Sequence, residues 1–288
     1  MKKSKLAKVL TVSLAALMVF GLASCGGGSG KVSDKDITVI SREEGSGTRD
    51  AFTELTGVLQ DDVDKTVDTA EISNSTSVVT QSVAGNDAAI GYISLGSLDD
   101  TVKAVKVDGV EATVDNIKSG DYKIQRPFNI VTKGEVKELP ADFIKFIMSK
   151  DGQKIIEAEG YISVNDNAEA YKASGLKGSI TLAGSTSVSP VMEVLADKYK
   201  ELNSGVTIEI QQTGSGAGIQ STTEGVCDIG MASRELKDEE TSQGLKSEEI
   251  ALDGIAVIVN KDNGVEDLSM DQIMKIFTGE ITNWADVK

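Results

Sequence analysis

Apolar, β-branched runs alternate along the chain with stretches in which apolar residues recur at helical spacing. The runs predict strands over residues 37–40, 88–95, 102–107, 128–132, 180–183, 206–211 and 250–260. The helical spacing predicts helices over residues 50–59, 140–159, 190–202 and 268–277, and a further helix from after Gly-Ser-Gly at residues 214–216 to about residue 224. Residues 165–177 are predicted to be a polar connector. This alternation indicates an α/β fold with largely parallel sheets.

The N-terminus has the pattern of a bacterial secretion signal. Four lysines precede an apolar stretch over residues 9–23, which is shorter than the ~20 residues that span a bilayer. The stretch ends in Leu22-Ala-Ser-Cys25, which resembles a lipobox. We expect residues 1–24 to be a signal peptide and residues 25–35 to be a lipidated Cys25 with a Gly/Ser tether, since two acyl chains give stable anchoring. The alternative is plain cleavage that leaves a free thiol.

Charge and composition narrow the classes of function. The chain has 288 residues and a formal charge of −16, and removal of the four lysines leaves 25 Lys and Arg against 45 Asp and Glu, a balance of −20. This excludes a sequence-independent nucleic-acid binder. The absence of histidine excludes Ser-His-Asp and Cys-His catalytic pairs, so we expect neither an enzyme nor a cofactor. With Cys25 lipidated, Cys227 has no partner and is expected to be a small buried hydrophobe.

Three junctions between a predicted strand and a predicted helix have the same chemistry. They lie at residues 41–50, 183–190 and 212–218, and each combines glycine with Ser or Thr. Glycine lets backbone N–H groups approach a ligand, hydroxyls donate hydrogen bonds, and a helix start adds unpaired N–H groups and a positive dipole end. Such junctions favour an anion site; the alternative is that these residues are only helix caps and turns.

The few arginines strengthen the anion hypothesis. The chain has only Arg42, Arg49, Arg126 and Arg234, and the first two flank one of the glycine junctions. A guanidinium group offers a planar fork that matches an oxyanion, although each could instead pair with a nearby acid. Because a charge of −20 repels anions, capture would depend on local dipoles and one or two guanidinium groups in a closed cleft. No P-loop lysine follows the glycines, which argues against a nucleotide site.

These segments resemble the phosphate-binding lipoproteins of bacterial phosphate ABC transporters. The resemblance covers essentially all of the chain after the tether, and its specific matches are residues 41–50 (SREEGSGTRD), 180–190 (ITLAGSTSVSP), 214–218 (GSGAG), 228–236 (DIGMASREL), 253–260 (DGIAVIVN) and 276–284 (IFTGEITNW). The resemblance implies a two-lobed type-II periplasmic-binding-protein fold, in which each lobe is a mostly parallel sheet flanked by helices and two crossing strands form the hinge. It implies a non-enzymatic monomer on the outer face of the cell membrane, with a permease and an ATPase as partners.

The resemblance also implies the phosphate ligands, which are Arg42, Ser46, Gly47, Thr48, Ser185, Thr186, Ser187, Ser215, Ser233 and Arg234. One position departs from the family, because many relatives have an aspartate where this chain has Ser233. That aspartate accepts the proton of monohydrogen phosphate, so Asp50 and Asp253 become the candidate acceptors. Two alternatives stay open, namely a receptor for sulfate, molybdate or tungstate and a surface lipoprotein without a role in transport.

The order of the halves also differs from the family, where a segment like residues 178–288 precedes one like residues 37–164. This indicates a circular permutation, which compact domains tolerate because their termini often lie close together. We therefore expect one lobe to be split between residues 36–121 and 253–288, the other to be continuous over residues 122–252, and the hinge strands to be residues 124–132 and 250–260. The alternative is a relic of tandem duplication or a truncated gene, whose halves pair between molecules.

Overall fold

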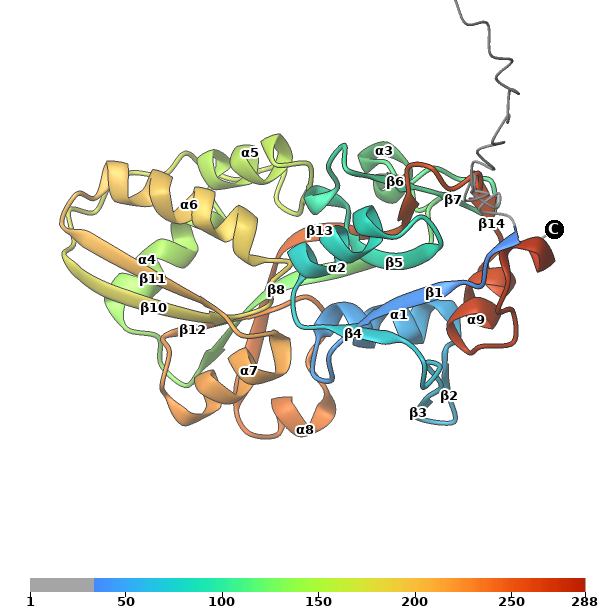
Figure 1. Ribbon diagram of the computed structural model, residues 1–288. Helices are drawn as coiled ribbons and strands as arrows, with labels where there is room; N and C mark the ends of the chain where they lie inside the picture. Colours follow the sequence, from blue (N-terminus) through green and yellow to red (C-terminus); the bar gives the residue numbers. More distant parts are fainter. Residues whose placement is uncertain (1–33, 288) are drawn as a thin grey trace, which may run out of the picture. The chain divides into compact units, whose positions relative to one another are not determined.

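Two long strands connect the two lobes of the molecule. In the computed structural model, which describes residues 34–287, β8 (Gln125–Lys133) pairs antiparallel with β13 (Leu245–Asn260), from Gly254 opposite Gln125 to Leu245 opposite Lys133. The sheet order is β11-β10-β12-β8-β13-β5-β1-β4. In Figure 1 these two strands run between a left-hand group of elements and a right-hand group. The signal peptide, Cys25 and most of the tether lie outside the described residues.

The continuous lobe lies on one side of this strand pair. Its strands are β9 (Ile162–Ser163), β10 (Gly178–Gly184), β11 (Val206–Gln212) and β12 (Ile229–Ala232), with β10 parallel to β11 and β12. Its helices are α4 (Glu138–Ile147), α5 (Lys150–Ala158), α6 (Ser189–Leu202), α7 (Ser215–Glu224) and α8 (Asp238–Thr241). Its main core packs α4, α5 and α6 against the sheet.

The split lobe lies on the other side, and its parallel centre is β4-β1-β5. Its strands are β1 (Thr38–Arg42), β2 (Leu59–Gln60), β3 (Val63–Asp64), β4 (Glu71–Ser73), β5 (Ala89–Ser94), β6 (Val102–Ala104), β7 (Lys106–Val107) and β14 (Asp267–Leu268). Its helices are α1 (Gly47–Thr56), α2 (Thr76–Gly85), α3 (Val114–Lys118), α9 (Met270–Phe277) and the short η2 (Leu95–Ser97) and η3 (Trp284–Asp286).

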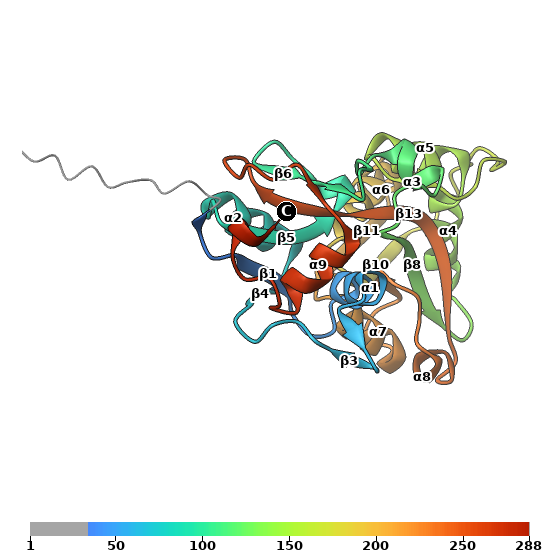
Figure 2. The same cartoon turned by 90° about the vertical axis from the view of Figure 1, so that its right-hand side faces the viewer.

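The central strands of the split lobe, β1, β5 and the C-terminal part of β13, are buried on both faces because helices cover both faces. Val39 packs in the core on the side of α1 and α9, whereas its neighbour Ile40 packs on the side of α2. In β13, Val257 packs on the side of α1 and α9, and its neighbour Ile258 packs on the side of α2. Figure 2 shows α1 and α9 beside each other over the sheet. A strand buried on both faces reads as a continuous apolar run, which is why the sequence predicts it well.

The two ends of the described chain meet at the surface of the split lobe. Asp36 and Asn283 form an antiparallel bridge, the N–H of Ile37 donates to the carbonyl of Thr282 at 2.8 Å, and the N–H of Trp284 donates to the carbonyl of Lys35 at 3.0 Å. Both ends of the described chain therefore belong to one lobe.

The structure corrects several details of the sequence prediction. The helix predicted over residues 140–159 is two helices, because Ser149 interrupts it and caps α5 by accepting the N–H of Gly152. The strand predicted over residues 102–107 is divided into β6 and β7. Tyr122 and Ile124, which the sequence prediction assigns to the continuous lobe, pack in the core of the split lobe. Within residues 34–287 no helix has the length and apolarity that a membrane crossing needs.

Candidate anion-binding site

Four helices direct their N-terminal ends to the place where the two lobes meet. α1 and α2 come from the split lobe, and α6 and α7 come from the continuous lobe. The residues at or next to these ends are Ser46, Thr76, Ser187 and Ser215. Unpaired N–H groups and the positive ends of helix dipoles favour an anion at such a place.

The junction between β1 and α1 turns sharply and touches the opposite lobe. Gly45 has a φ of 80°, and Ser46 caps α1 by accepting the N–H of Arg49 at 3.4 Å. The carbonyl of Gly45 accepts the N–H of Gly216 at 2.9 Å, which joins this junction to the start of α7. The first and third predicted junctions are thus in direct contact across the cleft.

The junction between β10 and α6 also depends on glycine. Gly184 has a φ of 144°, and a Cβ atom there would lie 2.2 Å from the carbonyl oxygen of Met231. The hydroxyl of Ser185 accepts the N–H of Ser187 at 3.2 Å and so holds the turn. The side chains that remain directed to the opposite lobe are those of Thr186 and Ser187.

The start of α7 packs against the start of α1. The hydroxyl of Ser215 accepts the N–H of Ser233 at 3.2 Å and lies 3.3 Å from the Ser233 hydroxyl. A Cβ atom on Gly47 would lie 2.5 Å from Ser215 Oγ and 2.8 Å from Ser233 Oγ. Only a residue without a side chain therefore fits at position 47 in this closed arrangement.

Hydroxyl groups of both lobes form one buried cluster. Thr48 Oγ1 lies 2.9 Å from Ser187 Oγ, and Thr76 Oγ1 lies 3.1 Å from Ser187 Oγ and 3.3 Å from Thr186 Oγ1. We call hydroxyl cluster the set Thr48, Thr76, Thr186, Ser187, Ser215 and Ser233, all of which are buried. Hydroxyls can donate to or accept from an oxyanion, so the cluster can replace its hydration shell.

Arg42 supplies the positive charge at the cluster. Its side chain is 2% exposed, and its Nη2 donates to Thr186 Oγ1 at 3.1 Å, while Nη1 lies 3.5 Å from Thr76 Oγ1. Its Nε and Nη2 also donate to the Glu43 carboxylate, each at 2.8 Å. The guanidinium group therefore bridges a carboxylate and the hydroxyls of both lobes.

Thr76 is the member of the cluster that the sequence prediction missed. It begins α2, for which no element was predicted, and its hydroxyl lies within hydrogen-bond distance of Arg42, Thr186 and Ser187. The signal in the sequence is the Ser-Thr-Ser run at residues 75–77, where Ser75 caps the helix by accepting the N–H of Val78. A hydroxyl run before a helix is an N-cap signal that could have revealed the fourth helix start.

Three predicted charged residues do not contact the cluster. Arg49 pairs with Asp64 at 2.6 Å. Arg234, predicted as a phosphate ligand, donates to the Glu240 carboxylate at 2.7 and 2.8 Å and pairs with Asp50 at 2.9 Å. Asp50, predicted as a possible proton acceptor, is thus the ion-pair partner of Arg234. The structure joins Arg42 to Thr186 and Thr48 to Ser187, and it places Ser215 beside Ser233. Ser46 and Ser185 accept backbone N–H groups of their own turns, and the three charges lie outside the hydroxyl cluster.

Asp253, the other candidate proton acceptor, supports the cluster from behind. It is 1% exposed, lies 3.2 Å from Arg126 Nη2 and accepts the hydroxyl of Ser94 at 2.9 Å. Arg126 in turn donates to the carbonyl of Ser233 at 3.2 Å. Burial raises the pKa of Asp253 to about 6, although Arg126 acts in the opposite direction. The pair belongs to the two strands that connect the lobes.

This raised pKa predicts a pH dependence of stability. The carboxyl titrates near pH 6 when folded and near its ordinary 3.8 when unfolded, so between these values the folded chain holds the extra proton. This group therefore favours the folded state more as the pH falls from 7 to 4, by up to about 1.4 kcal/mol per pH unit. Urea unfolding across this range should show the wild type gaining stability relative to Asp253→Asn as the pH falls. If the difference in unfolding free energy between the wild type and Asp253→Asn stayed constant with pH, the raised pKa of Asp253 would be wrong.

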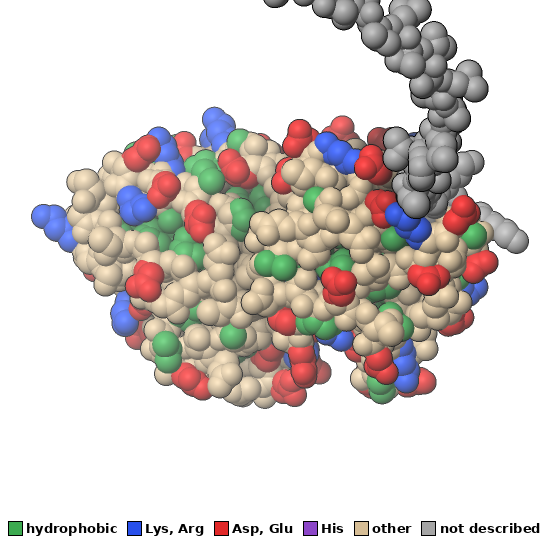
Figure 3. Space-filling model, in the orientation of Figure 1, with side chains coloured by type: hydrophobic (Ala, Val, Ile, Leu, Met, Phe, Trp, Pro, Cys, Tyr) green, Lys and Arg blue, Asp and Glu red, His purple; other side chains and the backbone are tan. Residues whose placement is uncertain are grey.

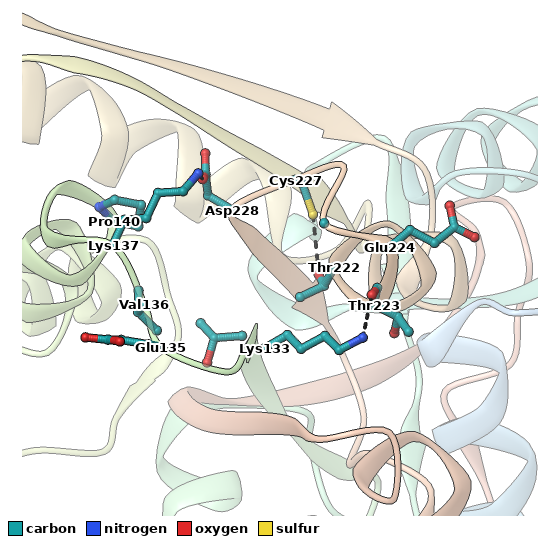
Figure 4. A pocket seen from close by; sticks show the side chains of 12 residues that line it. Lys133, Glu135, Val136, Lys137, Pro140, Thr222, Thr223, Glu224, Cys227 and Asp228 are labelled. Atoms are coloured by element: carbon teal, nitrogen blue, oxygen red, sulfur yellow. Dashed lines mark hydrogen bonds and ion pairs between the residues drawn. The ribbon is translucent and has the colours of Figure 1, made fainter.

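A separate hollow of about 330 Å³ lies in the continuous lobe, around Cys227 (Figure 4). The thiol is buried, unpaired with any described cysteine and 3.3 Å from Thr222 Oγ1, and burial raises its pKa. The two lysines of the hollow are occupied, since Lys137 pairs with Asp228 and Lys133 donates to the carbonyl of Thr223. The prediction of a buried Cys227 is confirmed, and the hollow does not have the arrangement of an anion site.

Comparisons with known proteins show which proteins this chain is similar to. A family model described as a PBP superfamily domain matches residues 28–151 and 169–288. Phosphate-binding protein PstS 2 of Streptococcus agalactiae serotype V is 52% identical over 100% of this chain and 99% of that protein. The phosphate-binding protein PstS of Bacillus subtilis is 38% identical over 38% of this chain and 37% of that protein. The crystal structure of a phosphate-binding protein of a phosphate ABC transporter from Streptococcus pneumoniae TIGR4 superposes with a TM-score of 0.72 and 48% identity, covering 88% of this chain and 100% of that chain.

Proposed function

This chain belongs to the PBP superfamily and, within it, to the PstS family of phosphate-binding proteins, and on this premise we propose that it captures inorganic phosphate for an ABC importer. The observation that carries the proposal is the hydroxyl cluster, to which two helix starts from each lobe contribute and to which Arg42 adds a positive charge. Its relatives are binding proteins rather than enzymes.

In this proposal the anion lies among the hydroxyl cluster, Arg42 and the N–H groups of Gly47 and Thr48 at the start of α1. Charge-assisted hydrogen bonds contribute roughly 1.5–3 kcal/mol each. Four or five of them can offset the ordering cost and leave about 8 kcal/mol, which corresponds to a micromolar dissociation constant. Closure of the lobes excludes water and strengthens each bond. The net negative charge of the chain makes this local arrangement necessary.

The proposal extends to the place of action. Cys25 carries the lipid that holds the protein on the outer face of the cell membrane, where a permease and an ATPase of the importer receive the phosphate. The lobe division and the exchanged order of the halves belong to the same proposal. The support is that the chain ends meet at Asp36 and Asn283, and that the Bacillus subtilis relative matches only 38% of the chain.

Isothermal titration with phosphate and with sulfate at neutral pH tests the proposal. The protein must first be unfolded and refolded to remove any anion that copurifies. We expect saturable heat with phosphate, with a dissociation constant in the micromolar range or below, and weak or no competition by sulfate. Absence of heat with phosphate would contradict the proposal.

A second candidate is a receptor for another oxyanion such as sulfate, molybdate or tungstate. The observation that favours it is that Asp50 and Asp253, the two candidate proton acceptors, lie beside Arg234 and Arg126 respectively. Only phosphate among these anions brings a proton at neutral pH, so a site without an acceptor discriminates less. Tighter binding of one of the other anions than of phosphate would favour this candidate.

A further inference from the structure

An ion-pair network outside the hydroxyl cluster also joins the two lobes. Arg234 belongs to the continuous lobe, and Asp50 lies on α1 in the split lobe. Arg234 Nε lies 2.9 Å from Asp50 Oδ2, and Lys237 Nζ lies 3.7 Å from the same oxygen. Both atoms of the Arg234–Asp50 pair are shielded from solvent and neither has a hydrogen-bond partner among residues 34–287, so the contact between them is one of opposite charges. The pair therefore forms only when the lobes are together.

The continuous lobe holds Arg234 in place by itself. Glu240 accepts both Nη1 and Nη2 of Arg234, and the carbonyl of Glu235 accepts Nη1 at 2.8 Å. Although burial opposes it, the hydrogen bonds from Arg234 keep the pKa of Glu240 below its ordinary value. Because Glu240 and the Glu235 carbonyl bind Nη1 and Nη2, the Nε edge of the guanidinium group faces Asp50 of the other lobe. Because the group is preorganised, the pair loses little side-chain entropy when it forms.

The surroundings of the pair place it at the lobe boundary. Asp50 and Arg234 line a groove of about 510 Å³. The other lining residues are Ala51, Thr53, Glu54, Leu55, Leu59 and Asp64 of the split lobe, and residues 125–127 and 235–237 of the hinge and the continuous lobe. Figure 3 shows the surface notched along its lower edge, between α8 and the β2–β3 hairpin. The groove is separate from the hydroxyl cluster, so an anion in the cluster leaves the pair intact.

We propose that Asp50 and Arg234 form a latch that closes the lobes over the anion, and that both are positioning residues rather than anion ligands. The inference rests on the proposed function. The hydroxyls of the cluster exchange their mutual hydrogen bonds for bonds to the anion, whereas the latch is the same with and without the anion. It therefore raises the population of the closed, binding-competent form, and affinity rises with that population.

The test compares phosphate binding by the wild type, Asp50→Asn, Arg234→Gln and the double variant. We expect Asp50→Asn to raise the dissociation constant about 3- to 10-fold, mainly through faster release, because a partly exposed pair contributes modestly. In the Asp50→Asn background, Arg234→Gln should add much less than it does alone. Asp50→Glu should restore part of the affinity.

Glu266→Gln is the matched control, because it removes one negative charge and breaks the Lys103–Glu266 pair within the split lobe, at 2.7 Å. We expect it to bind phosphate like the wild type. If Arg234 were an anion ligand, Arg234→Gln would cost the same with and without Asp50, and Asp50→Asn would leave binding unchanged or tighten it. Either result would overturn the latch.

Small-angle X-ray scattering of the anion-free protein separates this inference from the proposed function. Asp50→Asn should shift the scattering toward a larger radius of gyration, because the open form becomes more populated, while Glu266→Gln should not. If the wild type binds no phosphate but this shift occurs, the proposed function fails and the latch stands. If the wild type binds phosphate but Asp50→Asn changes neither affinity nor scattering, the latch fails.

Discussion

Arg42→Ala is expected to weaken phosphate binding at least 30-fold, or more than about 2 kcal/mol. Arg42 is buried and bridges the hydroxyls of both lobes, so its loss removes charge-assisted bonds to the anion and a contact that holds the lobes together. It also leaves the Glu43 carboxylate, which accepts two bonds from Arg42, without a counter-charge next to the anion. Isothermal titration with phosphate measures the loss.

Two further variants separate the causes of this loss. Arg42→Lys keeps the charge but cannot bridge Glu43 and Thr186 with a planar fork, so an intermediate affinity is expected. Adding Glu43→Gln to Arg42→Ala removes the uncompensated negative charge and should recover part of the affinity. If Arg42→Ala bound phosphate as tightly as the wild type, the arginine would be a structural partner of Glu43 and the anion would lie elsewhere.

The sequence predicts well those segments in which the surrounding structure permits only one kind of residue. The run over residues 250–260 forms most of β13, and its residues 255–259 are apolar at every position because helices cover both faces. Gly184 marks a turn because no Cβ atom fits against Met231. Such constraints are local, so one sequence reveals them. The same logic placed the three glycine junctions, which the structure joins at one site.

The parts that the sequence did not predict depend on distant partners. α2 is rich in Ser, Thr and Val, which have low helix propensity, and it is stable because Val79 and Val83 pack in a core against β1, β5 and β13. Missing the helix meant missing Thr76. In the same way, Arg234 belongs to a family motif and is predicted as an anion ligand, but its Nη1 and Nη2 donate to Glu240 and its Nε lies 2.9 Å from Asp50 Oδ2. The spacing of residues along the sequence does not show that these carboxylates hold Arg234 in place of an anion.

The lobe division shows where a sequence boundary and a packing boundary differ. Tyr122 and Ile124 precede β8 and were assigned with it, yet they pack in the core of the split lobe, where the Tyr122 hydroxyl donates to the carbonyl of Ile255 at 2.8 Å. Burial of the hydroxyl raises the pKa of Tyr122. The chain therefore leaves the core of the split lobe only after residue 124, where β8 begins. The Arg126–Asp253 pair joins β8 to β13 at this point, where the two strands pass between the lobes.

Gly47→Ala is expected to weaken phosphate binding about 10- to 100-fold while leaving the anion-free fold intact. In the closed arrangement the added methyl group would lie 2.5 Å from Ser215 Oγ and 3.1 Å from Ser215 Cβ. Either the lobes stay farther apart or the hydroxyls rotate away, and each change removes hydrogen bonds to the anion, at an overpacking cost of about 1–3 kcal/mol. Alanine suits the first turn of α1, so unfolding without phosphate should be unchanged or slightly harder.

Gly85→Ala is the matched control, because Gly85 is also helical and in the same lobe, but a methyl group added there would have no neighbouring atom within 4 Å. We expect this variant to bind phosphate like the wild type. Thermal unfolding with and without phosphate gives the second measurement, since the increase in Tm that phosphate causes should shrink for Gly47→Ala alone. Wild-type affinity in Gly47→Ala would mean that the start of α1 does not close against Ser215 and Ser233 when the anion is bound, and the hydroxyl cluster could then not be the site.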